Sequence, residues 1–261
     1  MSNTFPWPVP ATIPRVALVT GGAARLGRAI ALELARAGFD IAIHYNESAD
    51  AAERTAAEIR AIGRRGHVFQ ADLSREESVH ALLPAVMQAL GPVGVLVNNA
   101  STFYRDEWDD ATRVGWDAHM QPNTRAPFVL MQEFARLLPP QAQGMVLNML
   151  DERVWSLTPH FVSYTVSKAA LWTLTQTMAL ALAPRGIRVN AIGPGPVLPT
   201  PRQTAEHFAR QCASVPLGHG ATPDEIARAA LSLLCLPSVT GQMLALDGGQ
   251  HMQWSPAPRP A

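Results

Sequence analysis

Short runs of β-branched and other apolar residues alternate along this chain with longer stretches of helical period, and this alternation most constrains the fold. Strand, helix and strand at this spacing predict a parallel sheet, because a parallel neighbour needs a long crossover connection that usually holds a helix. The predicted class is therefore α/β: a single doubly wound Rossmann-type domain with a mainly parallel seven-stranded sheet and helices on both faces. The alternating segments are 16–20, 26–37, 41–43, 49–62, 67–70, 76–90, 93–97, 145–149, 187–191 and 243–246.

The prolines mark where this pattern stops. Four of the 22 prolines lie within residues 1–14, four within 194–201 and three within 256–261. The first and last groups predict a flexible N-terminal tail over 1–14 and a C-terminal tail over 253–261, on either side of one domain over 15–252. The middle group predicts a functional loop, whose conformation we leave open as far as residue 216.

Composition excludes several classes of function. Twenty-one basic and 21 acidic residues cancel, so no global field attracts nucleic acid or an anionic membrane, and we expect a small-molecule partner. No apolar run approaches the ~18 residues that span a bilayer, and the start of the chain lacks a signal peptide pattern. The two cysteines, Cys212 and Cys235, are too few for a disulfide framework, so we expect a cytoplasmic protein. Neither these cysteines nor the eight histidines have the spacing of metal ligands, so we expect no metal.

The first predicted strand ends in a glycine-rich loop that opens directly into a helix. The loop reads Thr-Gly-Gly-Ala-Ala-Arg-Leu-Gly, with Gly21, Arg25, Leu26 and Gly27 as candidate cofactor-binding residues. Glycines permit a tight turn and close backbone approach, and a helix N-terminus offers free N–H groups to a phosphate. The alternative is an ordinary glycine turn.

Candidate nucleotide contacts also follow the next three predicted strands. The second strand ends without a carboxylate, which an NAD ribose usually requires, so its neutral donors favour a 2′-phosphate and hence NADP(H). Glu47 disfavours NADP(H) if its carboxylate lies close to the 2′-phosphate, which it would repel, and it has no such effect if it faces solvent. The residues after the third and fourth strands fit the edges of an adenine and a ribose, although each is also compatible with a simple turn or cap. These candidates are His44, Tyr45, Asn46, Ser48, Asp72, Leu73, Asn98, Asn99 and Ala100.

Tyr164 and Lys168 lie four residues apart in a long helical stretch and therefore share one face of the helix. A phenol with its ordinary pKa near ~10 is a weak acid at neutral pH, and a nearby ammonium favours the phenolate. The spacing indicates a tyrosine acid assisted by a lysine.

Together these motifs resemble the short-chain dehydrogenase/reductase family over roughly residues 15–250. The resemblance also rests on Asn123, the Arg188-Val189-Asn190 string, Pro194, Gly195 and the Asp247-Gly248-Gly249 string, in the family's order. It implies that Tyr164 is the catalytic acid, that Lys168 binds the nicotinamide ribose, and that Asn123 holds a helix kink and a water relay. It places Pro194 and Gly195 among the cofactor contacts. It also implies a homotetramer, with the helices near 124–138 and 161–183 at the interface.

Three departures from the family pattern resemble its pteridine reductase branch, which includes the dihydromonapterin reductases. Arg25 stands where most members have glycine, Ser101 follows Asn-Asn-Ala where most have glycine, and Asp151 replaces the usual serine 13 residues before the tyrosine. The likeness implies that Arg25 reaches cofactor and pterin, that Phe103 stacks on the pterin, and that Asp151 joins Tyr164 in proton delivery. Residues 25, 101, 103, 151 and 164 are thus the expected substrate contacts.

We therefore expect an NADPH-dependent reductase of a dihydropterin or dihydrofolate C=N bond. Two alternatives stay open: a carbonyl reductase of the 3-oxoacyl type, and a non-catalytic dinucleotide-binding protein. Asp151 disfavours the first, because a ketone oxyanion is stabilised by a hydroxyl donor and not by a second anion. Three of these candidates also have a purely structural interpretation. Asp151 could cap a turn, Phe103 could be a packed loop aromatic, and Arg25 could form a surface ion pair with Glu47 or Asp50.

Overall fold

Seven parallel strands form one sheet in the order β3-β2-β1-β4-β5-β6-β7, which confirms the predicted class. The computed structural model describes residues 8–200 and 203–252. Every neighbouring pair of strands is parallel, so the sheet is wholly and not only mainly parallel. The strands are β1 Val16–Val19, β2 Asp40–Tyr45, β3 Gly66–Gln70, β4 Val95–Asn98, β5 Gly144–Met149, β6 Ile187–Pro194 and β7 Met243–Leu246.

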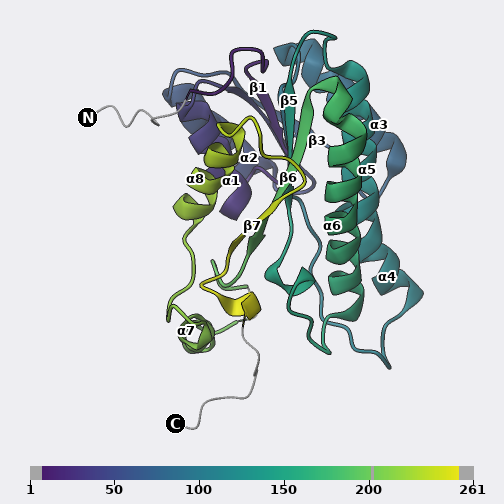
Figure 1. The fold of residues 1–261 in the computed structure, drawn as a ribbon, viewed down its shortest axis with the longest axis vertical. Helices are drawn as coiled ribbons and strands as arrows, with labels where there is room; N and C mark the ends of the chain where they lie inside the picture. Colours follow the sequence, from purple (N-terminus) through teal and green to yellow (C-terminus); the bar gives the residue numbers. More distant parts are fainter. Residues whose placement is uncertain (1–7, 201–202, 253–261) are drawn as a thin grey trace.

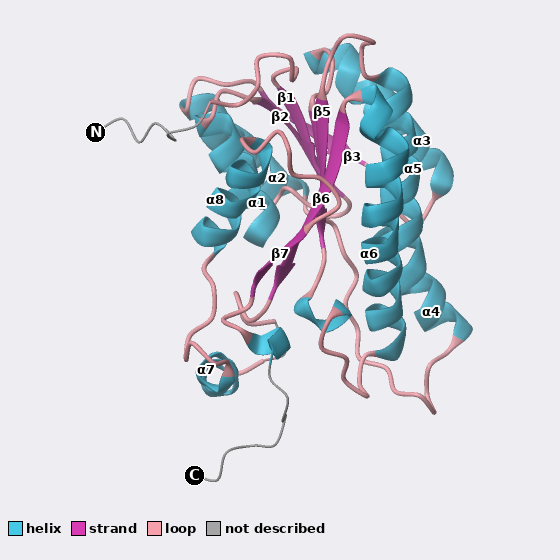
Figure 2. Ribbon diagram, viewed as in Figure 1, coloured by secondary structure: helices cyan, strands magenta, loops and turns pink. Residues whose placement is uncertain are grey.

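Helices cover both faces of the sheet (Figures 1 and 2). One face carries α1 Arg25–Arg36, α2 Ala49–Ala61 and α8 Pro223–Leu234, which form one hydrophobic core with the sheet. The other carries α3 Glu76–Leu90, α5 Ala126–Leu137 and α6 Val162–Leu182 over a second core. Two further helices, α4 Arg113–Met120 and α7 Ala205–Ser214, and four short turns, η1 Gln121–Arg125, η2 Glu152–Val154, η3 Ala183–Arg185 and η4 Gln250–Met252, complete the described chain.

The strand order reverses at β1, which pairs with β2 on one side and β4 on the other. Connections after β1 and β4 therefore leave toward opposite faces and open a crevice beyond the carboxyl ends of the strands. The glycine loop follows β1, and the Asn-Asn-Ala-Ser segment follows β4. The topology thus brings the two predicted ends of the site to one edge of the sheet.

The packed part of the chain begins before residue 15, where the sequence placed the end of the first tail. Ile13 is only 2% exposed and belongs to the core, and the Thr12 hydroxyl donates to Gln143 Oε1 at 2.6 Å. The remainder of both predicted tails, residues 1–7 and 253–261, lies outside the described residues. None of the described helices is long and apolar enough to cross a bilayer.

Candidate active site

The predicted phosphate loop is a tight turn packed against the first turn of α1. Gly21 has a φ of +61°, a left-handed conformation that favours glycine. At Gly27, a Cβ atom would lie 2.2 Å from the Gly21 carbonyl oxygen, so only glycine lets the helix approach the loop this closely. This cradle of backbone at a helix N-terminus fits the phosphates of a dinucleotide.

Asn99 and Ala100, which the sequence placed among the cofactor contacts, hold this loop from the adjacent strand. The Asn99 side-chain amide donates to the carbonyl oxygens of Thr20 at 2.9 Å and Gly21 at 3.2 Å. The Thr20 hydroxyl accepts the backbone N–H groups of Asn99 and Ala100. These bonds fix the glycine loop relative to the carboxyl end of β4.

His44 does not take the place at the 2′-phosphate that the sequence suggested. It is 2% exposed, its Nδ1 accepts the Gly21 N–H at 3.1 Å, and its Nε2 lies 2.9 Å from the Ala71 carbonyl oxygen. Both ring nitrogens are thus engaged by backbone, and burial lowers the pKa of the imidazole. His44 is therefore not available to a 2′-phosphate, because its ring points into the protein. It supports the glycine loop as a neutral side chain.

The remaining predicted nucleotide contacts surround the loop without lining the main cleft. The Asn46 carbonyl accepts from Gln70, and Ser48 stands at the N-terminus of α2. Asp72 accepts from the backbone and hydroxyl of Ser74, which lowers the pKa of its carboxyl. Three others point partly or wholly into the protein: Tyr45 is half-buried, Leu73 lies in the core, and Asn98 donates to Asn148.

Tyr164 and Asp151 form the centre of the site. The Tyr164 hydroxyl donates to Asp151 Oδ2 at 3.0 Å, although the two residues come from α6 and from the end of β5. The other oxygen, Oδ1, accepts the Arg153 N–H at 3.0 Å and caps η2. Asp151 therefore has both of the roles considered from the sequence: one carboxyl oxygen caps the turn η2 and the other accepts the hydrogen bond from Tyr164.

The electrostatics of Tyr164 differ from the expectation that a lysine lowers its pKa. The phenol is 6% exposed, and its pKa is raised well above the ordinary value by burial, by the negative charge of Asp151 and by the hydrogen bond to it. Asp151 and burial thus outweigh any cation, because a carboxylate at 3.0 Å disfavours the phenolate directly. The phenol of Tyr164 is therefore protonated at neutral pH.

Lys168 lies one turn along α6, with its ammonium 5.8 Å from the Tyr164 ring centroid. It is 3% exposed and donates to the Met149 carbonyl oxygen at 2.8 Å. Burial lowers its pKa to about 8, so the charge at neutral pH is held by little more than this bond and the field of Asp151. The ammonium is available to a ribose hydroxyl in the cleft.

Asn123 lies in a π-helical turn between α4 and α5, which is the kink that the resemblance implied. Its side chain is fully buried, donates to the Thr102 carbonyl at 3.0 Å and to Ser167 Oγ at 3.0 Å, and accepts the Thr102 N–H at 2.8 Å. Asn123 therefore fixes the loop that carries Ser101 and Phe103 to the face of α6.

Phe103 is an exposed aromatic on the wall of the cleft, backed by a second ring. Its ring lies parallel to that of Phe161, with centroids 4.8 Å apart and an interplanar angle of 8°, and edge-on to Tyr164 at 4.6 Å. The Arg153 guanidinium lies over Phe161 at 4.6 Å. Phe161 itself has a φ of +59°, a strained conformation for a bulky residue. This stack orients Phe103, which is both packed and available to a ligand.

Arg25 does not form the surface ion pair with Glu47 or Asp50. Its guanidinium donates to the carbonyl oxygens of Pro199 at 3.0 Å and Leu198 at 3.3 Å, and thereby ties the glycine loop to the proline-rich loop across the cleft. The backbone of Arg25 has a φ of +52°, which disfavours any residue but glycine and asparagine. A side chain is kept here at some conformational cost.

One cleft of about 270 Å³ is lined by the predicted acid Tyr164, by Lys168 and Asp151, and by several of the predicted cofactor and substrate contacts. Ten of the predicted site residues line it: Arg25, Leu26, Asn99, Ser101, Phe103, Asp151, Tyr164, Lys168, Pro194 and Gly195. Met149, Leu150, Val197 and Leu198 also line it and were not singled out from the sequence. The first two are apolar residues at the end of β5, which carry no sequence signal of their own, and the last two lie in the predicted proline-rich loop whose conformation was left open. Within the described residues, no cluster of His, Cys, Asp or Glu is arranged to hold a metal.

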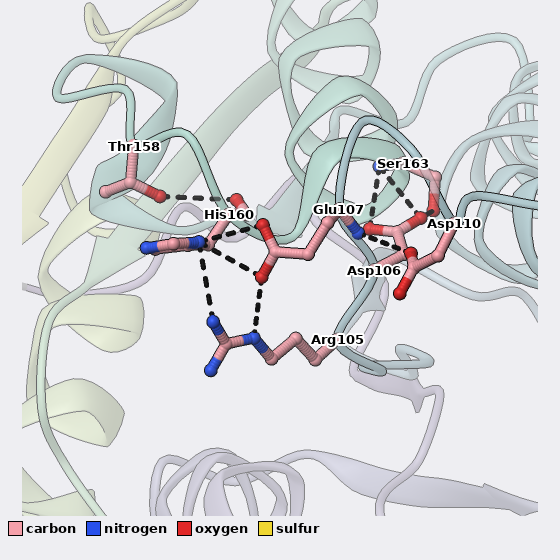
Figure 3. Close-up of polar contacts among 7 residues, drawn as sticks. All are labelled: Arg105, Asp106, Glu107, Asp110, Thr158, His160 and Ser163. Carbon is pink, nitrogen blue, oxygen red and sulfur yellow. Dashed lines mark hydrogen bonds and ion pairs between the residues drawn. The ribbon is translucent and has the colours of Figure 1, made fainter.

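A polar clamp that sequence reasoning missed joins the loop after β4 to the start of α6 (Figure 3). The Asp106 carboxylate accepts the N–H and the hydroxyl of Ser163, and Glu107 pairs with His160 Nδ1 at 2.8 Å and with Arg105. More than 50 residues separate Asp106 from Ser163 and Glu107 from His160, so no local pattern reveals these two pairs. The clamp holds the segment bearing Phe103 against the helix bearing Tyr164.

Comparisons with known proteins agree with this fold. Residues 21–251 match the family described as enoyl-(acyl carrier protein) reductase. A short-chain dehydrogenase/reductase of Armillaria gallica is 33% identical, over 90% of this chain and 95% of its own length. The 3-oxoacyl-[acyl-carrier-protein] reductase FabG of Staphylococcus epidermidis is 30% identical, over 90% and 98% respectively.

A solved structure is more similar than these relatives. The crystal structure of FolM alternative dihydrofolate reductase 1 from Brucella suis, in complex with NADP, superposes with a TM-score of 0.88 and is 45% identical. The match covers 92% of this chain and 96% of that one.

Proposed function

The chain belongs to the short-chain dehydrogenase/reductase family of oxidoreductases, and we propose that it uses NADPH to reduce the C=N bond of a dihydropterin or dihydrofolate. The observation that carries the proposal is the 3.0 Å hydrogen bond between the Tyr164 hydroxyl and the Asp151 carboxyl. A carboxyl in this position suits a reaction that delivers a proton to nitrogen, and it does not suit stabilisation of a ketone oxyanion.

The residues of the glycine loop and the cleft fit NADPH, which supplies a hydride when bound. Gly21 and Gly27 admit the phosphates, Lys168 is placed for the nicotinamide ribose, and Pro194 and Gly195 form the opposite wall. The Brucella protein of known structure binds NADP, which supports the same choice here. We propose that the neutral donors at the end of β2, Tyr45, Asn46 and Ser48, face the 2′-phosphate.

Proton delivery then runs through Tyr164 and Asp151. The raised pKa of Tyr164, caused by burial and by Asp151, keeps the phenol protonated and makes it a poor acid alone. When Asp151 carries a proton, it donates to the phenol oxygen while the phenol donates to the ring nitrogen of the substrate. The Asp151 O–H bond and the Tyr164 O–H bond break together, and the tyrosine is left neutral.

The side chains that line the cleft select the shape of the substrate. Phe103 offers an aromatic face to a flat heterocycle, and Asp151 and Ser101 offer polar groups to its edge. Arg25 closes the side of the cleft through the carbonyl groups of Leu198 and Pro199.

A carbonyl reductase of the 3-oxoacyl type is the second candidate, favoured by the 30% identity to FabG. The deciding experiment measures NADPH oxidation in parallel with dihydrobiopterin, dihydrofolate, a 3-oxoacyl thioester and a simple ketone. We expect turnover of the first two. Fast turnover of only the last two would replace our choice by the carbonyl reductase.

The homotetramer and the cytoplasmic location stay predictions. Light scattering of the purified protein measures the assembly, and a monomer at micromolar concentration would exclude the tetramer.

A further inference from the structure

His119 on α4 is a buried histidine that neither the motifs nor the mechanism above uses. It is 1% exposed, and both of its ring nitrogens are engaged. Nε2 accepts the backbone N–H of Tyr104 at 3.0 Å, and Nδ1 lies 2.6 Å from the Ser163 hydroxyl oxygen. Tyr104 directly follows Phe103 in the loop after β4, and Ser163 is the second residue of α6. His119 therefore bridges the loop that carries the exposed aromatic of the cleft and the helix that carries Tyr164.

The two ends of this bridge fix where each hydrogen lies. The Tyr104 N–H is a backbone donor, so Nε2 carries no hydrogen. A neutral imidazole then has its hydrogen on Nδ1, which donates to the Ser163 oxygen. The Ser163 hydroxyl donates in turn to the Asp106 carboxylate (Figure 3). The result is a one-way chain of hydrogen bonds that starts at the Tyr104 N–H and ends at the Asp106 carboxylate.

Only the neutral imidazole completes this chain. A protonated imidazole carries a hydrogen on both nitrogens, so its Nε2–H would face the Tyr104 N–H and no bond would form between them. Burial lowers the pKa of His119, against the opposing charge of Asp106. Two phenols also face the ring, those of Tyr104 and Tyr164, each with its ring centroid 5.9 Å from that of the imidazole. Burial therefore favours the form that the geometry requires.

Phe103 lies between two anchored residues of its loop. On one side, Thr102 forms two backbone hydrogen bonds with the Asn123 side chain. On the other side, the Tyr104 N–H is bound to His119. The bond to His119 thus fixes the backbone on the side of Phe103 that the Asn123 bonds do not hold.

The ring that stacks behind Phe103 is held at the other end of the same chain. The Asp106 carbonyl oxygen accepts the Phe161 N–H at 2.9 Å, and the Asp106 carboxylate accepts from Ser163. The rings of Phe103 and Phe161 are parallel, with centroids 4.8 Å apart. His119 therefore connects the backbone beside one ring of the stack to the residue that holds the other.

We propose that His119 is a positioning residue for the organic substrate: as the Nδ1–H tautomer it holds Phe103 where a flat ring binds, and it acts through Phe103 without touching the substrate. His119 does not line the cleft, whereas Phe103 does. The inference rests on the proposed function only for the identity of that ring, a dihydropterin. Neither hydrogen bond of His119 involves the Tyr164 hydroxyl or Asp151, so the expected effect is on KM and not on kcat.

The first test observes the tautomer in the unsubstituted, full-length enzyme. Solid-state ¹⁵N NMR of histidine-labelled protein, at a pH above the ordinary histidine pKa of ~6.5, should show a protonated Nδ1 and an unprotonated Nε2 for His119. Loss of these signals in His119→Asn assigns them. His44 is the internal control and should be the opposite tautomer, because its Nδ1 accepts the Gly21 N–H. A hydrogen on Nε2 of His119 would overturn the proposal.

The second test compares two amides that differ by one methylene group. In His119→Gln the carbonyl oxygen reaches the position of Nε2 and accepts from Tyr104. In His119→Asn the shorter amide reaches only the position of Nδ1, so it keeps the contact with Ser163 and loses the one with Tyr104. Both variants keep a polar group at the buried site, which favours folding.

Steady-state kinetics with dihydrobiopterin and saturating NADPH give the readout. His119→Asn should raise KM about 2- to 10-fold, the range for loss of the Phe103 stack, with kcat and the Kd for NADPH close to those of wild type. His119→Gln should restore most of the affinity. Equal KM values in the two variants would refute the positioning role.

A double variant tests whether His119 acts through Phe103. Without the Phe103 ring there is nothing to position, so Phe103→Ala combined with His119→Asn should have the KM of Phe103→Ala alone. Effects that multiply would contradict the proposal. Thr175→Val is the control for a lost buried hydrogen bond, because the Thr175 hydroxyl is buried and accepts from Asn148. It should lower Tm and leave KM unchanged, and a rise in KM equal to that of His119→Asn would assign the effect to lost stability.

These tests separate the inference from the proposed function. The tautomer is measured without substrate. If the enzyme turns over the 3-oxoacyl thioester and no dihydropterin, the proposed function fails, and the same variants compared on the thioester decide the role of His119. If dihydropterin is reduced and the two amides give equal KM values, the proposed function stands and the positioning role fails.

Discussion

Asp151→Asn isolates the proton-transfer role of the carboxyl from its structural roles. Asparagine has nearly the same shape, and its Oδ1 still accepts the Arg153 N–H that Asp151 accepts at 3.0 Å, so the cap on η2 is retained. The amide Nδ2 then replaces Oδ2 beside Tyr164, so it donates to the phenol oxygen instead of accepting from the hydroxyl, and it neither takes up nor releases a proton. We therefore expect a Tm within about 2 °C of wild type, because losses of ~0.5 kcal/mol correspond to shifts of this size.

The kinetic effect should be large. A positioned general acid contributes about 10²–10⁴ in rate, so kcat on dihydrobiopterin should fall by at least about 10² while the Kd for NADPH stays unchanged. Two of the three leading causes that raise the pKa of Tyr164 are the charge of Asp151 and the hydrogen bond to it. Without the negative charge, the pKa of the phenol should fall toward its usual value.

The pH dependence gives the sharpest assay. In wild type, the useful form carries a proton on Asp151 as well as the one on Tyr164, so activity should rise as the pH falls below neutrality. In Asp151→Asn this acidic limb should flatten, and Asp151→Ser, which restores the hydroxyl of the wider family, should do the same and gain slight ketone reduction. The measurement is kcat/KM between pH 5 and 8 on one dihydropterin. An unchanged acidic limb in both variants would remove Asp151 from proton delivery.

Three further expectations follow from the cleft. Phe103→Ala should raise the KM for dihydropterin about 2- to 10-fold, from a stacking loss of about 0.5–1.5 kcal/mol, with a smaller effect on NADPH; an unchanged KM would assign Phe103 to packing alone. Arg25→Ala removes the bonds to Leu198 and Pro199, so steady-state kinetics should show a higher KM for both NADPH and dihydropterin. KM values equal to those of wild type would mean that Arg25 contributes to neither binding site. NADPH should be preferred over NADH at least about tenfold in kcat/KM, given ~1.5–3 kcal/mol per charge-assisted bond to a 2′-phosphate, and equal values would contradict this.

The order of strands and helices was predictable because its signals are local. A short segment in which β-branched residues alternate with polar ones, such as 187–191, and a helical period such as 76–90 each lie within one stretch of sequence, and the resulting elements are β6 Ile187–Pro194 and α3 Glu76–Leu90. The site motifs were predictable for a related reason. The offset of 13 residues between Asp151 and Tyr164 spans one strand-to-helix connection, so both side chains arrive at the same edge of the sheet.

What the sequence by itself determined is thus the fold class, the glycine loop and the pair of Tyr164 with Asp151. Only the tertiary structure decided which partner each polar side chain takes: His44 turns inward to backbone, Arg25 reaches the proline-rich loop 173 residues away, and Glu152 is buried without a partner for Oε2. The physical reason is that burial and pairing depend on how the loops after β1, β5 and β6 cross at the carboxyl edge of the sheet. Period and spacing record which face a residue occupies, and they carry no information on which distant segment covers that face.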